Sequence, residues 1–111
     1  MKLSYEDHDT VSVITVSGDL TADQVDGFRR SCQERWSAGV RDVVLDVEHM
    51  TFIDSAGLEV LLWLVDEGGD RGGQLRLVKP DETIRKILEI TRLEKRFDVH
   101  MSIEAAAKSL R

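Results

Sequence analysis

The sequence predicts an α/β fold: a mixed, largely parallel central β-sheet of about five strands with four α-helices. Two observations carry this prediction. Segments typical of strands alternate with segments typical of helices, after two strands at the start, and the middle of the chain holds the nearly continuous apolar run "DVVLDV", Asp42 to Val47. A strand that helices cover on both faces is apolar throughout. We therefore expect this run at the centre of the sheet, with right-handed crossovers between parallel strands and one antiparallel hairpin at the start.

Length and composition indicate one compact domain, residues 1–111. Fifteen basic residues against twenty-one acidic ones give a net charge of −6, which disfavours direct binding of nucleic acid or an anionic membrane. The longest apolar run, Val60 to Val65, is far shorter than the ~20 residues that span a bilayer. The amino terminus lacks the apolar core of a signal peptide. We therefore expect a cytoplasmic protein without a membrane segment.

The hairpin is expected at the start of the chain. Leu3 and Tyr5 alternate with polar residues, the polar stretch "EDHD" follows, and a β-branched run begins at Val11 and reaches Val16. Alternation and β-branched residues are typical of strands. Gly18 then breaks the second strand.

The first helix is expected to begin at a capping box made by Thr21 and Gln24. It should run to about Ala38 and stop at Gly39. Apolar residues within it recur at intervals of three and four, which places them on one face against the sheet; they are Val25, Phe28, Cys32 and Trp36. This position favours a core role over a reactive role for Cys32, the single cysteine, which has no partner for an internal disulfide.

The second half of the chain repeats the alternation. A second helix is expected from about Ser55 to Asp70, the loop "RGGQ" and the strand "QLRLV" follow, and a third helix begins at the segment Lys79 to Asp81. A short edge strand at "DVHM" and a final helix capped by Ser102 complete the pattern. The expected inward residues of these last two helices are Ile84, Ile87 and Leu88, and Ile103, Ala106, Ala107 and Leu110.

The stretch "FIDSAGLEVLLWL", Phe52 to Leu64, places Ser55 where the central region hands over to a helix. Functional groups collect at such junctions because exposed backbone amides point outward there. Either Asp54 or Ser55 could cap the helix, or Ser55 could be a hydroxyl that another enzyme modifies. Residues alone leave these alternatives balanced.

Two catalytic interpretations are disfavoured. A nucleophile elbow needs glycine two residues on either side of the serine, but Ile53 precedes Ser55 and only Gly57 fits; each of the three histidines, at positions 8, 49 and 100, is interpreted as a loop or surface residue. A phosphoacceptor aspartate at Asp46 would need an acidic pair for Mg²⁺, and Asp19 stands alone. No zinc, nucleotide or other cofactor motif is present. We therefore expect a protein that is not an enzyme and uses no cofactor.

A helical wheel of the second helix places Leu58, Leu61, Leu62 and Val65 on the buried face. Val60 and Trp63 then point nearly the opposite way, beside Glu59. A tryptophan on an acidic outer face is a candidate anchor for a partner. The alternative is that Trp63 lies under another part of the same chain.

The segments "VVLDVEHMTFIDSAGLEVLLWL" and "GGQLRLVKPDETIRKILEITRLEKRFDVHMSIEAAAKSL", with the earlier "VSGDLT", resemble the STAS domains of bacterial anti-sigma factor antagonists. The likeness covers nearly the whole chain. Its most specific part is Asp54 to Leu58, where Ser55 resembles the serine that a cognate kinase phosphorylates. Ala56 replaces a second hydroxyl residue common in the motif, and Thr21 stands where many members carry an acid.

The resemblance implies partner switching. The unphosphorylated protein would bind an anti-sigma factor that has serine kinase activity, phosphorylation of Ser55 would break the complex, and a serine phosphatase would restore it. The resemblance and the helix pattern together imply a partner-binding surface made of Asp19, Thr21, Asp54, Ser55, Ala56, Gly57, Glu59, Val60 and Trp63. Weak homodimerisation stays open. The alternative function is a STAS scaffold subunit, for example of a lipid-transport assembly, in which Ser55 only caps the helix.

Overall fold

The computed structural model covers residues 1–111 and contains six strands, four α-helices and one short 3₁₀ helix. In chain order the elements are β1 (Lys2–His8), β2 (Val11–Leu20), α1 (Val25–Ser37), β3 (Asp42–Asp46), β4 (Met50–Ile53), α2 (Ser55–Asp70), β5 (Leu75–Val78), α3 (Glu82–Ile90), η1 (Glu94–Arg96), β6 (Val99–His100) and α4 (Ile103–Lys108). The predicted mixed α/β architecture is confirmed, with one strand more than expected.

The sheet has the strand order β1-β2-β3-β5-β6. The hairpin partners β1 and β2 are antiparallel, with Tyr5 opposite Ile14, and every other pair in the sheet is parallel. β3 lies at the centre, as its apolar sequence predicts. The long strand β2 pairs with β3 along its first half and with β4 near its end, so β4 extends the sheet beyond the end of β3.

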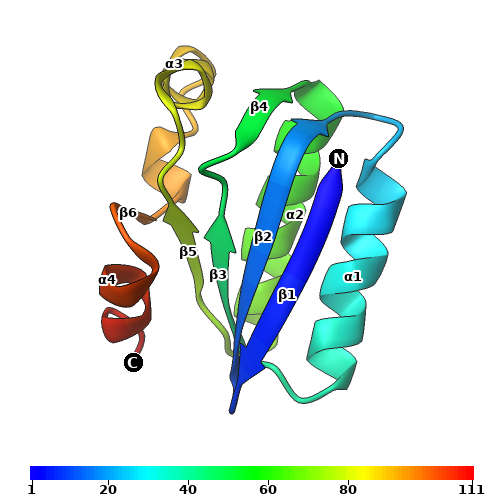
Figure 1. The fold of residues 1–111 in the computed structure, drawn as a ribbon, viewed down its shortest axis with the longest axis vertical. Helices are drawn as coiled ribbons and strands as arrows, with labels where there is room; N and C mark the ends of the chain where they lie inside the picture. Colours follow the sequence, from blue (N-terminus) through cyan, green and yellow to red (C-terminus); the bar gives the residue numbers. More distant parts are fainter.

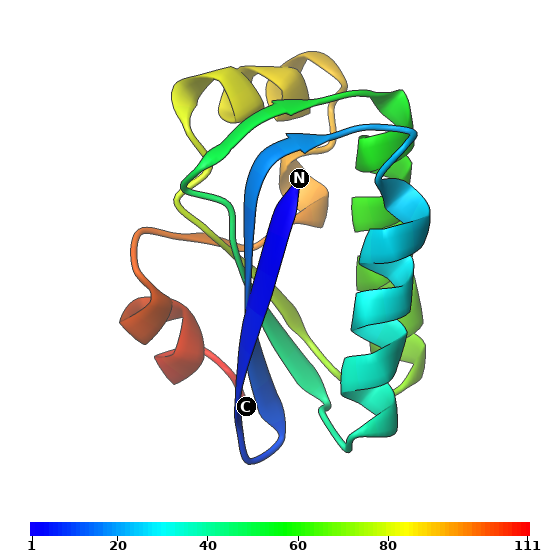
Figure 2. The same cartoon turned by 45° about the vertical axis from the view of Figure 1, so that its right-hand side comes forward.

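Helices cover the sheet unequally. α1 and α2 lie side by side against one face, α4 covers part of the other face, and α3 lies across the end of the sheet beside β4 (Figures 1 and 2). The end of β2, β4 and the first turn of α2 therefore meet at the same end of the molecule (Figure 2).

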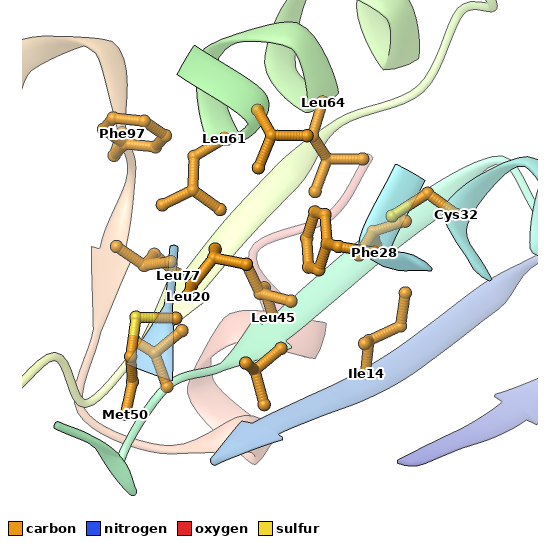
Figure 3. Close-up of a cluster of buried hydrophobic side chains, with 14 of the residues drawn as sticks. Ile14, Leu20, Phe28, Cys32, Leu45, Met50, Leu61, Leu64, Leu77 and Phe97 are labelled. Carbon is orange, nitrogen blue, oxygen red and sulfur yellow. The ribbon is translucent and has the colours of Figure 1, made fainter. Parts of the chain in front are cut away.

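The main core lies between the sheet and the helices α1 and α2. Phe28 and Cys32 of α1, Leu61 and Leu64 of α2 and the strand residue Ile14 belong to this cluster, with Phe28 near its middle (Figure 3). Cys32 is fully buried, and this burial raises the pKa of its thiol to about 12. The predicted core role of Cys32 is confirmed.

Two expectations about element boundaries were wrong. α1 begins at Val25, with Gln24 at its N-cap and no side-chain capping bond, because Thr21 closes a separate turn in which its carbonyl accepts from the Gln24 amide. Residues 50–53, for which the sequence predicted no strand, form β4 because the end of β2 offers them a parallel edge.

The ends of the later helices agree with the prediction. Asp81 caps α3 by accepting from the Ile84 amide, and Ser102 caps α4 by accepting from the Ala105 amide. In α4 only Ala106 is buried, while Ile103 stays exposed. The inward face of the last helix is therefore smaller than its sequence suggests.

Candidate functional site

Asp54 joins two loops at the end of the sheet. As the N-cap of α2 it accepts from the Gly57 amide through Oδ1 at 2.8 Å, and its Oδ2 accepts from the Ala22 amide, in the loop after β2, at 3.0 Å. The Asp54 amide in turn donates to the Leu20 carbonyl. One carboxylate thus holds the β2–α1 loop against the start of α2.

These bonds stabilise the ionised form of Asp54. The bond from the Gly57 amide is the main cause that lowers the pKa of Asp54, and the bond from Ala22 adds to it, against a smaller opposing effect of desolvation. Hydrogen bonds to a carboxylate favour its charged form, and the positive end of the helix dipole acts in the same direction.

The Ser55 side chain has no structural role in the fold. It is the first residue of α2 and is exposed, and Asp54 rather than Ser55 makes the capping bond. Its hydroxyl makes no hydrogen bond within the protein. Of the two possible caps that the sequence left open, the structure selects Asp54, so Ser55 presents an unengaged hydroxyl to solvent.

Gly57 allows the close approach of α2 to β2. A Cβ at this position would lie 2.6 Å from Ile53 Cγ1 and closer still to the carbonyl oxygen of Leu20. Real Cβ atoms do not approach other atoms so closely. The glycine of the "DSAG" motif is therefore required by packing, and it lies under the surface rather than on it.

A β-bulge lies beside Ser55 and was not anticipated from the sequence. The register of β2 with β4 pairs Gly18 with Met50 and Asp19 with Phe52, so Thr51 is an extra residue on β4. Its hydroxyl donates to Asp19 Oδ1 at 2.9 Å. Met50 and Ile53 point into the core, and the two residues between them, Thr51 and Phe52, are both exposed. A signal existed in the sequence, since two buried apolar positions three residues apart do not fit strict alternation.

The expected outward face of α2 requires a correction. Val60 has an exposed fraction of 0 % and belongs to the main core. The prediction that it points away from the core was wrong, because the buried face of α2 is rotated from the expected one. Val60 and Leu64 are buried, whereas the expected core residues Leu62 and Val65 are only partly buried. Val60 cannot contact a partner while the helix keeps this packing.

Trp63 lies between the two helices. Its ring is 5.4 Å from that of Trp36 on α1, centroid to centroid, and the Arg29 guanidinium lies 5.0 Å above it. It is partly buried and packs against the main core. The alternative considered for Trp63, a place against another part of the same chain, matches this arrangement better than an open outer face does.

The remaining expected partner-binding residues lie around Ser55. Asp19 and Glu59 are exposed, whereas Thr21 and Ala56 are partly buried. No lysine or arginine occurs in residues 11–28 or 42–70, which supply the two loops and the start of α2. These segments therefore contribute only acidic charge to the region of Ser55, from Asp19, Asp23, Asp54 and Glu59.

The chain matches the family model "STAS domain" over residues 2–106. The chain belongs to the STAS domain family. One relative, BtrV of Bordetella bronchiseptica, a proposed anti-sigma factor antagonist, is 28% identical over 111 residues, which cover 100% of this chain and 96% of BtrV. No helix in the structure combines the length and the apolar character needed to cross a bilayer.

Solved STAS structures share the fold. A proposed anti-sigma factor antagonist from Thermotoga maritima superposes with a TM-score of 0.89 at 22% identity, covering 98% of this chain and 94% of that one. The Bacillus anti-sigma factor antagonist SpoIIAA in its unphosphorylated form gives a TM-score of 0.81 at 22% identity, covering 96% and 95%. Its phosphorylated form gives 0.75 at 22% identity, covering 96% and 98%.

Proposed function

We propose that this STAS protein is an anti-sigma factor antagonist that works by partner switching, with Ser55 as its phosphoacceptor. In its unphosphorylated state it binds an anti-sigma factor that is also a serine kinase. Phosphorylation releases it, and a serine phosphatase returns it to the binding state. The protein acts as substrate and ligand rather than as enzyme, and it works in the cytoplasm, where sigma factors act.

The observation that carries this proposal is the unengaged hydroxyl of Ser55. Asp54 caps α2, and Gly57 permits its packing, so neither local structure nor packing needs a hydroxyl at position 55. An exposed hydroxyl on a rigid helix start is a suitable substrate for a separate kinase. The relatives support the same conclusion, since the fold is shared with SpoIIAA, a protein solved in a phosphorylated form.

Charge explains why phosphorylation releases the partner. A phosphate on Ser55 adds about −1.5 to −2 charges to a surface that already carries Asp54 and Glu59, and residues 42–70 hold no lysine or arginine. The dipole of α2 favours the phosphate by only about 0.3–1 kcal/mol. The phosphate therefore finds no lysine or arginine in the helix and strands that carry it, and its main effect is repulsion and desolvation in the docked complex.

The test is phosphorylation in vitro. The purified protein is incubated with ATP and each histidine-kinase-like anti-sigma factor of the source genome, and the phosphate is mapped by mass spectrometry. We expect one phosphate, on Ser55, and none on the Ser55→Ala variant. If no kinase modifies Ser55, the proposal fails and the scaffold function takes its place.

A binding measurement with the same kinase tests the release step. Ser55→Ala should keep the affinity of the wild type, because the hydroxyl makes no bond that the fold needs, whereas Ser55→Asp should weaken binding by adding a charge. Calorimetric titration of the two variants gives the comparison. Equal affinities would contradict release by repulsion.

A further inference from the structure

We infer that Phe52 is the apolar anchor by which the kinase partner docks beside Ser55, in a pocket that basic residues surround. This inference rests on the proposed function and identifies the surface that the partner recognises. It assigns to the β-bulge of β4 the role that the sequence alone gave to Val60 and Trp63.

The backbone conformation of β4 directs the Phe52 side chain into solvent. Strict alternation along β4 would turn Phe52 inward after Met50, but the extra residue Thr51 reverses the side on which Phe52 emerges. The ring is 47% exposed although it lies next to Ile53, which is buried. A bulge commonly re-aims one side chain near a functional site, and here the side chain it turns outward is a large aromatic one.

The bulge is fixed on both strands. Thr51 donates to the Asp19 carboxylate at 2.9 Å, and the Gly18 amide donates to the His49 carbonyl at 2.9 Å. Asp19 is also the register partner of Phe52 across the two strands. The aromatic ring and the carboxylate are therefore presented together at a rigid position, which lowers the entropic cost of binding.

Phe52 and Ser55 are both exposed and lie at the same end of the sheet (Figure 2). They are separated by Ile53 and Asp54, and Asp54 also ties the start of α2 to the β2–α1 loop at Ala22. A kinase that reaches Ser55 must cover this end of β4. An aromatic side chain at the centre of such a contact is the type of residue that contributes most to binding.

Charge complementarity identifies the partner surface. The segments that carry Phe52 and Ser55 contribute only acidic charge, including Asp19 and Glu59, and hold no lysine or arginine. The neighbouring helix α3, which packs beside β4, adds exposed groups of both signs. The matching surface is an apolar pocket with a basic rim. A nucleotide-binding kinase fits this requirement, because kinases hold the phosphates of ATP with positively charged groups.

The test compares Phe52→Ala with Tyr5→Ala, a matched aromatic control that is 53% exposed on β1. The measurements are Kd for the cognate kinase, kcat/KM for phosphorylation of Ser55, and Tm. We expect Phe52→Ala to raise Kd and lower kcat/KM by about ten-fold with little change in Tm, and Tyr5→Ala to leave Kd and kcat/KM unchanged. Binding of the wild type should also weaken as salt is raised, since the surfaces are oppositely charged.

Three results would overturn the inference. If the wild type is phosphorylated on Ser55 but Phe52→Ala binds as tightly as the wild type, the anchor is wrong and the proposed function stands. Equal losses in both variants would show a general effect rather than an anchor. If light scattering shows that the wild type is a homodimer and Phe52→Ala a monomer, while kinase binding is unchanged, the partner that contacts Phe52 is a second copy of this chain. Absence of Ser55 phosphorylation in the wild type instead removes the proposed function and this inference with it.

Discussion

Asp54 and Gly57 fix the start of α2 in different ways. Asp54 acts through its charge, which two backbone amides from separate loops stabilise. Gly57 acts through the absence of a side chain, which lets α2 lie against Leu20 and Ile53. Ser55 and Ala56, which lie between them, neither cap the helix nor allow its close packing. The motif can therefore expose the Ser55 hydroxyl on a rigid helix start.

Gly57→Ala should destabilise the protein. The added methyl group would overlap the Leu20 carbonyl and the Ile53 side chain, and overpacking of this kind costs about 1–3 kcal/mol. Gly27→Ala is the control, because a Cβ at this position, in the first turn of α1, meets nothing within 4 Å. That variant should gain at most about 0.5–1 kcal/mol from reduced backbone entropy. The free energy of unfolding of both variants, measured in urea, tests this prediction. Stability changes of the same sign in the two variants would contradict the packing role of Gly57.

The stability contributed by Asp54 should depend on pH in one direction. Its pKa is lowered in the folded state, chiefly by the Gly57 amide, so the folded protein binds a proton less readily than the unfolded chain does. The contribution is complete above the unfolded pKa of about 3.9 and is lost as the pH falls through the folded value. Asp54→Asn keeps a capping oxygen but cannot ionise.

The measurement is the free energy of unfolding of the wild type and of Asp54→Asn between pH 7 and pH 2. The wild type should be the more stable protein at pH 7, and the difference should shrink on acidification. A difference that stays constant across this range would show that the charge of Asp54 does not matter to the fold.

At the scale of elements, α1 and α2 are joined by a stack of aromatic and basic side chains. Trp36 and Trp63 contact each other, Arg29 lies over Trp63, and Arg71 lies over Trp36 at 4.4 Å. Cation–π contacts contribute about 0.5–1 kcal/mol each at exposed sites. The outer edge of the interface between α1 and α2 is therefore a structural contact rather than an open surface.

Trp63→Ala should therefore lower stability. We expect a loss of about 1–3 kcal/mol, below the ~3–5 kcal/mol of a fully buried aromatic residue, because part of the ring is in solvent. The affinity for the kinase should stay within about two-fold of the wild type. Glu59→Ala, an exposed change on the same helix, is the control for Tm. A variant that kept its Tm and lost affinity would restore Trp63 as a partner anchor.

The elements that the sequence predicted well are those with a local cause. The caps of α3 and α4 depend on Asp81 and Ser102, which bond to amides three residues later. The core face of α1 follows from its own periodicity. β4 and the burial of Val60 have non-local causes, since the first needs the free edge at the end of β2 and the second depends on how α2 packs against the rest of the fold.

The candidate site also combines features with local causes and features with non-local causes. The motif around Ser55 is contiguous, so its position could be predicted from the sequence. The link between Asp54 and Ala22 spans 32 residues, as does the bond between Thr51 and Asp19, and no local pattern reveals either. Phe52 was overlooked for this reason, because its exposure depends on a bulge that only the pairing with β2 creates.

At the scale of the whole molecule, the two faces of the sheet are unequal. The face under α1 and α2 holds a cluster of 20 buried residues, whereas the face under α4 holds three, namely Val44, Val78 and Ala106. α4 has six residues, too few to be stable as an isolated helix. Its attachment depends on Arg76, whose Nε donates to Ser109 Oγ at 2.7 Å and lies 3.0 Å from Asp98 Oδ2.

This inequality predicts that α4 opens separately from the rest of the fold. Its few buried contacts give it a lower opening free energy than β3, which lies at the centre of the sheet. In hydrogen exchange, the α4 amides should exchange at least about ten-fold faster than those of β3 after correction for intrinsic rates. Arg76→Met keeps the apolar stem and removes the bonds to Asp98 and Ser109. It should further accelerate hydrogen exchange in α4 and leave the exchange rates of α1 and α2 unchanged.

The same experiment separates this account from global cooperativity. If α4 and β3 exchanged with one common free energy, the small cluster would be part of a single cooperative unit, and Arg76→Met would then raise exchange everywhere. Local opening instead leaves the end of the sheet that carries Ser55 and Phe52 undisturbed, because these residues are held by β2, β4 and α2. The kinase affinity of Arg76→Met should then equal that of the wild type, which binding calorimetry can check on the same sample.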